Sequence, residues 1–461
     1  MTMHLIQVGR QVVPLLAVLF VLATLSPAAA RDLPLVAAAK SADRSALRAL
    51  LERGASVDAA EGDGTTALHW ASYRDDVECV DLLLRAGANV NAANDLGATP
   101  LWTASLNGSA AMIGRLLQAG ANPNLALLSG ETPVMVASRS GSPAVVEQLL
   151  ARGAKVNARG ARGQTALMWA VAQKHPDVVK VLVAHGADLH ARSDVWGQVM
   201  AVAPHGLPEY NRSIPSGGDT ALMFAARVGE LDSAQLLVAA GANVNDADAW
   251  GVSATMLAAH SGFTRLVELL LGKGANPNVS SPGFTALHEA VMRRDQKMVA
   301  ALLAHGADAN APLRAWTPTR RLSKDFNFDP TLVGATPFWL AARFSDPAVM
   351  RLLVKYGADP LFVHHADYHA GDPAERRTQV TTALMAATGM GGGTAWVQPD
   401  RADRQALTLE AVKLAVELGV DLNAANTDGR TALDAARALK HEGVVTLLVE
   451  RGARPGTSKS R

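Results

Sequence analysis

The sequence predicts an all-α solenoid of about eleven stacked helix-turn-helix units with projecting β-turn fingers. Three observations predict this fold. A phrase of the form Gly-x-Thr-Ala-Leu recurs along the chain, and a second phrase, Gly-Ala-Asn or Gly-Ala-Asp, follows its threonine by 21 residues in nearly every copy. Apolar residues between the two phrases recur at helical spacing. A fixed period of this length is the signature of a repeat architecture rather than of separate globular domains.

The period is read from the threonine of the first phrase. The first four copies are spaced by 33 residues each, and the later spacings run from 32 to 55 residues. Residues 33–64 fit the same register one unit earlier. The threonine position is occupied by Thr66, Thr99, Thr132, Thr165, Thr220, Ser253, Thr285, Thr336, Thr382 and Thr431.

Each unit carries the signals of two short helices. Thr66 and its equivalents stand where a helix N-cap is needed, because a hydroxyl there accepts a hydrogen bond from an orphan backbone N–H. Leu68 and Ala71 lie three residues apart and share one face of the first helix. Val80 begins the apolar stripe of the second helix, and Gly87 ends that helix in a left-handed conformation. Because no single unit buries both stripes, neighbouring units must stack.

These units resemble the ankyrin repeat. One unit reads Thr66-Ala67-Leu68-His69-Trp70-Ala71, then Val80-Asp81-Leu82-Leu83-Leu84, then Gly87-Ala88-Asn89-Val90-Asn91. The resemblance covers Leu33 to Arg454, so we expect an array over residues 31–454 and a short, polar, disordered tail over 455–461. It implies protein partners as a class, and it implies that His69 and His288 bond to the backbone and to threonine near the helix start.

The composition excludes several classes of function. The 461 residues carry 43 Lys and Arg against 42 Asp and Glu, a net charge of +1. The chain lacks the basic charge of nucleic-acid binders, so we expect no nucleic-acid partner. Its one cysteine, Cys79, excludes an internal disulfide framework and multi-cysteine zinc sites, and we expect it in the core.

The N-terminus has the anatomy of a secretory signal peptide over residues 1–30. Arg10 precedes an apolar run from Val12 to Leu25, and small residues up to Ala30 supply a cleavage site. The run of about 14 residues is shorter than the roughly 20 that a spanning helix needs. We therefore expect an exported, periplasmic or secreted chain without membrane insertion after cleavage; an uncleaved anchor is the alternative.

The extra residues of the longer units form four insertions. Those at about 189–219, 309–335 and 360–381 all leave the finger, so we expect them to project from one edge, the last two side by side. The fourth, at about 389–403, lies between the two helices of one unit and is expected at the opposite edge. Its glycines lack the lysine of a phosphate-binding loop, which predicts a flexible connection.

The finger insertions hold side chains of the types enriched at interfaces. We predict partner contacts there, with neutral insertions that pack on the rod as the alternative. The candidates are Trp196, Tyr210, Arg212, Trp316, Arg320, Arg321, Lys324, Phe326, His364, His365, Tyr368 and His369.

Two further patterns are candidate sites. His365, Asp367 and His369 would face one side of an extended strand, but their spacing matches no recognised metal signature, so we expect solvated histidines and no metal or other cofactor. The residue two after the buried leucine of each first helix leans toward the concave face. Trp70, Trp169 and Phe224 at this position form either a recognition stripe or packing between first helices.

No catalytic motif is present, neither a nucleophile elbow nor a zinc-protease signature. The sequence therefore predicts a non-catalytic protein-interaction scaffold, which binds an unidentified protein partner through its concave face and finger insertions. One alternative is a small-ligand or metal receptor formed by the insertions at 309–335 and 360–381. The other is an accessory subunit or chaperone of an exported enzyme.

Overall fold

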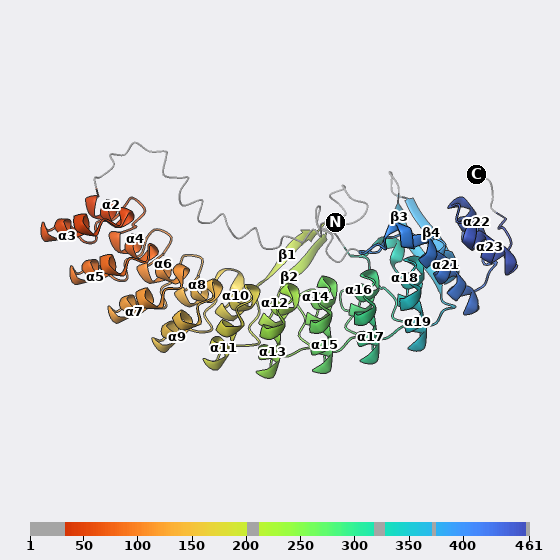
Figure 1. The fold of residues 1–461 in the computed structure, drawn as a ribbon, viewed down its shortest axis with the longest axis horizontal. Helices are drawn as coiled ribbons and strands as arrows, with labels where there is room; N and C mark the ends of the chain where they lie inside the picture. The colour runs from red at the N-terminus through yellow and green to blue at the C-terminus, as the bar shows by residue number, and fades with distance from the viewer. Residues whose placement is uncertain (1–32, 201–211, 318–327, 371–374, 458–461) are drawn as a thin grey trace.

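The computed structural model describes residues 33–200, 212–317, 328–370 and 375–457. The predicted signal peptide and the last four residues of the predicted tail lie outside these ranges. Within them, twenty-two α-helices form eleven pairs, which confirms the predicted solenoid. Figure 1 shows the pairs following one another along a curved row, with the first helix of each pair on the concave side and the second on the convex side.

The helix bounds follow the sequence period. The first helices are α2 (Pro34–Ser41), α4 (Ala67–Tyr73), α6 (Pro100–Asn107), α8 (Pro133–Ser140), α10 (Ala166–Ala172), α12 (Ala221–Val228), α14 (Ala254–Ser261), α16 (Ala286–Met292), α18 (Pro337–Arg343), α20 (Ala383–Ala387) and α22 (Ala432–Ala438). The second helices are α3 (Arg44–Glu52), α5 (Val77–Arg85), α7 (Ala110–Gln118), α9 (Pro143–Ala151), α11 (Pro176–Ala184), α13 (Leu231–Ala239), α15 (Thr264–Gly272), α17 (Gln296–Ala304), α19 (Pro347–Lys355), α21 (Arg401–Glu417) and α23 (Glu442–Glu450). None of these described helices is long and apolar enough to cross a membrane.

Local hydrogen bonds explain where the helices begin and end. The Thr99 hydroxyl accepts from the backbone N–H of Trp102 at 3.2 Å and caps α6. Gly87, with φ at +86°, ends α5 in the left-handed region that favours glycine. His69 Nδ1 lies 2.8 Å from the Thr66 hydroxyl, and its Nε2 lies 2.9 Å from the Ala98 carbonyl oxygen of the next unit. The predicted structural role of this histidine is therefore confirmed.

The core runs without interruption along the array. Leu68, Cys79 and Leu83 are all fully buried, and equivalent apolar residues continue the same cluster from Leu35 to Leu448. Burial raises the pKa of the Cys79 thiol to about 12, which makes it an unreactive core residue.

A ladder of asparagine side chains ties the loops that follow the second helices. Asn124 donates to the carbonyl oxygen of Gly153 at 2.9 Å and accepts from the backbone N–H of Lys155 at 2.8 Å. Asparagines at the equivalent positions repeat one or both bonds: Asn91, Asn157, Asn245, Asn278, Asn310 and Asn423. His190 and Leu361 occupy this position where two of the insertions begin, and the ladder is interrupted at both.

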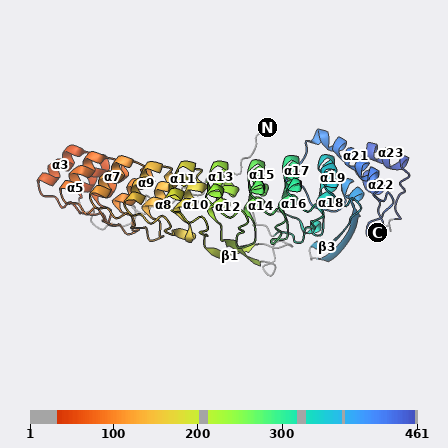
Figure 2. The same ribbon diagram turned by 90° about the horizontal axis from the view of Figure 1, so that it is seen from below.

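Two of the finger insertions form antiparallel hairpins. In the first, β1 (Val195–Met200) pairs with β2 (Arg212–Gly217). In the second, β3 (Val363–Ala370) pairs with β4 (Glu375–Thr382). Seen in Figure 2, both hairpins lie along the same edge of the array, as the sequence predicts.

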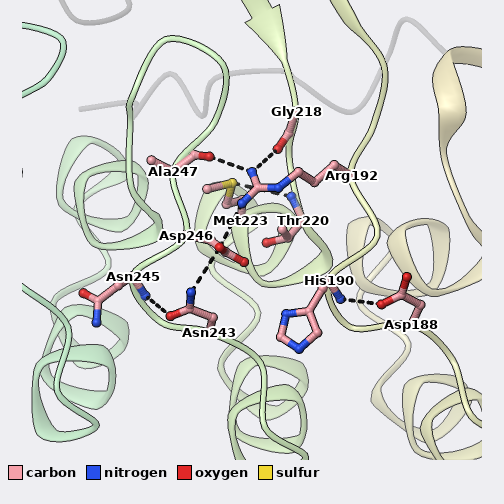
Figure 3. Close-up of polar contacts among 10 residues, drawn as sticks. All are labelled: Asp188, His190, Arg192, Gly218, Thr220, Met223, Asn243, Asn245, Asp246 and Ala247. Atoms are coloured by element: carbon pink, nitrogen blue, oxygen red, sulfur yellow. Dashed lines mark hydrogen bonds and ion pairs between the residues drawn. The ribbon is translucent and has the colours of Figure 1, made fainter.

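Arg192 fastens the first hairpin to the neighbouring units. Its guanidinium donates to the carbonyl oxygens of Gly218 at 2.9 Å and Ala247 at 2.7 Å, and to the carboxylate of Asp246 at 2.8 Å (Figure 3). Asn243 donates to the same carboxylate at 3.1 Å. This chain of polar contacts lies beside His190, where the asparagine ladder is interrupted.

The insertion at 309–335 packs on the array over its described residues. Leu313, Phe328 and Leu332 are fully buried, the last in the short 3₁₀ helix η4 (Pro330–Leu332). His364 of β3 lies 2.9 Å from the Val333 carbonyl oxygen, so this insertion and the hairpin at 360–381 lie side by side as expected.

The fourth insertion differs from its prediction. Residues 401–403, expected in a loop, form the first turn of α21. Residues 389–400 fold back across the concave face instead of forming a flexible connection. Met390 and Ala395 are buried there, and Gly391 passes so close to Trp339 that a Cβ on this glycine would lie 2.5 Å from the indole ring.

Candidate protein-binding surface

Two rows of first-helix residues line the concave face. We call the residues four positions after each helix cap the central row, and those seven positions after it the end row. The central row is Ala37, Trp70, Thr103, Val136, Trp169, Phe224, Leu257, Glu289, Leu340, Ala386 and Ala435. The end row is Lys40, Tyr73, Leu106, Arg139, Ala172, Arg227, His260, Met292, Arg343, Gly389 and Ala438.

The first six units leave this face partly exposed, except at Val136, which is buried, and we call them the open part. Trp70, Trp169 and Phe224 of the central row are half-buried, so each both packs against a neighbour and presents an edge to solvent. Lys40 lies 4.6 Å from the ring centre of Trp70, and the Trp70 indole N–H donates to Glu61 at 2.7 Å. Lys40 and Glu61 also form an ion pair.

The same arrangement returns three units later. The Arg139 guanidinium carbon lies 5.4 Å from the ring centre of Trp169, and Arg139 pairs with Glu131 at 2.9 Å. Arg227 pairs with Asp219 at 2.9 Å. These end-row cations are thus neutralised by carboxylates from the fingers, which leaves a surface of aromatic rings and balanced charge.

The next three units are covered, and we call them the closed part. Leu257, Glu289 and Leu340 of the central row are buried there. Residues 389–400 form part of the cover. Arg343 donates to the carbonyl oxygens of Gly392 at 2.7 Å and Gly393 at 3.1 Å.

Trp396 anchors this covering segment. Its backbone N–H donates to the Met292 carbonyl oxygen at 3.0 Å, and its ring centre lies 5.0 Å from that of His260. The Phe328 ring, from the insertion at 309–335, lies 5.2 Å from the Trp396 ring. The segment and the finger insertion therefore meet over α16.

Glu289 is a buried ionisable residue of the central row that the sequence analysis did not single out. Its side chain is fully buried, and neither carboxylate oxygen has a hydrogen-bond partner among the residues that the structure describes. Burial raises the pKa of Glu289 well above its ordinary value, opposed by the charge of Arg293. His260 Nδ1 lies 3.8 Å from the carboxylate. The sequence does contain a signal for Glu289, because it is the one charged residue in the central row.

The structure places the predicted insertion residues in different surroundings. Trp196 is partly exposed, with the Arg162 guanidinium 5.1 Å from its ring centre. Trp316 is half-buried. The remaining candidates of the first two insertions, whose side chains lie outside the described part of the chain, are Tyr210, Arg212, Arg320, Arg321, Lys324 and Phe326.

Successive side chains of β3 point to opposite faces of the hairpin, which places the candidates of the third insertion in different surroundings. His365 and His369 are exposed, and Tyr368 is half-buried on the other face. His364 is fully buried with its ring centre 4.3 Å from that of Trp339, so its predicted place on an accessible surface is wrong. His364 lies on the face of β3 that is turned toward the array, and its ring lies beside Gly334.

The expected facing of His365, Asp367 and His369 does not create a metal site in the structure. Arg376 donates two hydrogen bonds to the Asp367 carboxylate, at 2.9 and 2.6 Å, and this pairing lowers the pKa of Asp367. Across the described residues, no cluster of three or more metal-type ligands is close enough to hold an ion.

The family models that match this chain agree with the architecture. The family model for ankyrin repeats (3 copies) matches residues 35–126, 115–193 and 222–312, that for ankyrin repeats (many copies) matches 167–238, and that for a single ankyrin repeat matches 333–365. The crystal structure of the human ASB11 ankyrin repeat domain is 30% identical, covering 53% of this chain and 99% of that chain with a TM-score of 0.44. No curated protein matches. The family-model matches span more than half of the residues, and the chain belongs to the ankyrin-repeat family.

Proposed function

We propose that this protein is a non-catalytic scaffold that binds a protein partner through the open part of its concave face. Ankyrin repeats generally mediate protein–protein interaction, and proteins built from them are typically binding scaffolds. One observation supports placing recognition here: the central row is half-buried at Trp70, Trp169 and Phe224, whereas Leu257 and Leu340 in the same row are buried.

The half-buried aromatic residues suit this role chemically. Tryptophan and arginine supply much of the energy at protein interfaces. Tryptophan offers a large rigid ring with one N–H donor, and arginine offers a planar guanidinium with five. Here they occur side by side, as in the pair Arg139 and Trp169. The hairpin β1–β2 borders the same face and offers Trp196 as a further contact.

The proposal includes export. The signal-peptide pattern over residues 1–30 supports a mature chain that begins at Arg31 and acts in the periplasm or outside the cell. Mass spectrometry of the protein expressed in a secreting host tests this. A mature mass that begins at Arg31 supports export, and retention of the full chain inside the cell contradicts it.

A capture experiment tests the binding surface. The baits are the mature chain, the double variant Trp169→Ala with Arg227→Ala, and the control Lys180→Ala, whose side chain is exposed on the second helix α11. A partner retained by the mature chain and the control, and lost by the double variant, supports recognition on the open part. Equal capture by all three baits would place recognition elsewhere.

A further inference from the structure

The hairpin β1–β2 projects from the edge of the array and has one strand whose outer side is unpaired (Figure 2). At the base of this strand, the Asp194 N–H donates to the Arg162 carbonyl oxygen of the preceding unit at 2.8 Å. Beyond Asp194, β2 is the only strand of the described chain that pairs with β1. The outer side of β1 is therefore a sheet edge, and such an edge presents backbone groups that pair readily with another chain.

Pro215 shows which backbone groups of β1 point outward. Along an antiparallel pair of strands, residues that exchange hydrogen bonds with their partner alternate with residues that do not. Pro215 lies opposite Gly197 and has no N–H, so these two residues belong to the second kind. The Gly217 carbonyl oxygen, two residues along β2, accepts from the Ala249 N–H at 2.9 Å, which places Gly217 in the same kind. The β1 residues whose N–H and C=O groups point away from β2 are therefore Val195, Gly197 and Val199.

The outer side of β1 is open to a further strand, whereas that of β2 is obstructed. Two outward positions of β2 are Pro215, which lacks a donor, and Gly217, whose carbonyl oxygen is already bound. On β1, Val195 and Val199 are 60% and 70% exposed, and no side chain of the strand is ionisable. The second hairpin differs, because β3 and β4 carry acidic and basic side chains, and charges on edge strands hinder pairing between chains.

The sequence of β1 is complementary to itself. Its valines, Val195 and Val199, lie two residues before and two residues after Gly197. When two β1 strands pair in antiparallel order with the Gly197 residues opposite each other, Val195 of each copy lies opposite Val199 of the other. All three outward residues of one strand then meet outward residues of the other, so each of the three pairs exchanges two hydrogen bonds. β-Branched residues that lie opposite each other also stabilise the pairing.

We infer that two copies of this chain associate through β1, so that their hairpins form one four-stranded antiparallel sheet with a two-fold axis at Gly197. The same residues contribute from both copies, which is the self-complementary interface of a two-fold dimer. A second copy is favoured over a strand of another protein, because β1 itself supplies the matching positions for the hydrogen bonds and the valines. This association uses the edge of the hairpin and not the concave face, so it is independent of the proposed function.

Sedimentation equilibrium of the mature chain and its variants measures the dissociation constant of the dimer. Val195→Lys combined with Val199→Lys places lysine opposite lysine at two symmetry-related positions, which should weaken the dimer at least about tenfold. Val195→Lys combined with Val199→Glu instead places lysine opposite glutamate, and this variant should associate at least about tenfold more tightly than the two-lysine variant. The control Leu128→Lys changes an exposed leucine on another finger, and it should associate like the unaltered chain.

A disulfide tests the position of the two-fold axis. The Cα atoms of a hydrogen-bonded antiparallel pair lie about 5.5 Å apart, which suits a disulfide. Gly197→Cys combined with Ser213→Ala should therefore give a covalent dimer on mild oxidation; the alanine makes room for a Cβ that would otherwise lie 2.5 Å from the Ser213 hydroxyl oxygen. Val195→Cys should stay unlinked, because its counterpart in the other copy lies about 13 Å away along the strand. Cys79 is buried and does not compete.

Three results would overturn the inference. They are a chain that stays monomeric at millimolar concentration, a dimer that survives both lysines, and a lysine–glutamate variant that associates as weakly as the two-lysine variant. If the unaltered chain is monomeric but the two-lysine variant loses the captured partner, the edge receives a strand of that partner and not of a second copy. The capture experiment with the concave-face variant reports separately on the proposed function, so either proposal can fail without the other. Thermal unfolding of each variant confirms that lost association does not reflect lost folding.

Discussion

Replacing Glu289 by leucine should stabilise the protein, and the gain should increase with pH. The carboxyl group is fully buried without a hydrogen-bond partner among the described residues. A buried polar group left unsatisfied costs about 1–3 kcal/mol even when it is neutral. Leucine removes that cost and fills the position as Leu257 and Leu340 do in neighbouring units. At pH 5 we therefore expect a gain of about 1–3 kcal/mol in the free energy of unfolding.

The pH dependence follows from the raised pKa of Glu289. The unfolded chain releases this proton near the ordinary glutamate value of 4.5, whereas the folded protein retains it to a higher pH. Above pH 4.5 the unfolded state binds fewer protons, so stability falls as pH rises, by up to about 1.4 kcal/mol per pH unit until the folded pKa is reached. The advantage of leucine over glutamate should therefore be larger at pH 8 than at pH 5.

Urea denaturation at pH 5, 6, 7 and 8 measures the effect, with Glu289→Gln as the matched control. Glutamine keeps the unsatisfied polar group but cannot ionise, so it should remove the pH dependence and little of the constant cost. A leucine variant that is less stable at every pH, or whose advantage shrinks as pH rises, would refute the reasoning. Either result would mean that the carboxylate is stabilised as an anion by His260 or Arg293.

The remaining predictions concern packing. Leu68→Ala should lower the free energy of unfolding by about 2–5 kcal/mol, because it leaves a cavity between stacked units; a cost near zero in urea denaturation would mean that the side chain is not core. Trp396→Ala should release the covering segment, so that limited proteolysis cuts within residues 389–400 faster than in the unaltered chain; unchanged cleavage would show that the segment is held without its anchor. Replacing residues 364–381 with a short finger should lower the midpoint of thermal unfolding, since the buried His364 packs on Trp339; replacing 196–216 in the same way should change it much less.

The fold was predictable because its signals are local. The Thr99 hydroxyl caps α6 and Gly87 ends α5 through bonds made within a few residues, so the period reveals every helix pair. The choice between packing and exposure in the central row was not predictable. Phe224 and Leu340 occupy equivalent positions, yet only Leu340 is fully buried, because segments distant in sequence cover it.

In the candidate sites, too, features that depend on local geometry were predictable and features that depend on distant segments were not. Side chains two or four residues apart on a strand lie on the same face, so the sequence predicted that His365 and His369 would share a face. Both are exposed on the same face of β3. That His364 is buried depends on the separate insertion whose Val333 carbonyl lies 2.9 Å from its ring. Such contacts between insertions leave no periodic pattern, and neither does the return of residues 389–400 across the concave face.

The interrupted asparagine ladder makes the mechanical response of the array uneven. Between most units, neutral amide bonds join neighbours, and dissolved salt barely weakens them. At His190 the link is instead the chain formed by Arg192, Asp246 and Asn243. The ion pair in it is partly exposed, so added salt screens it. The stiffness of the rod at this joint should therefore depend on ionic strength more than it does at a joint that is held by asparagine amide bonds alone.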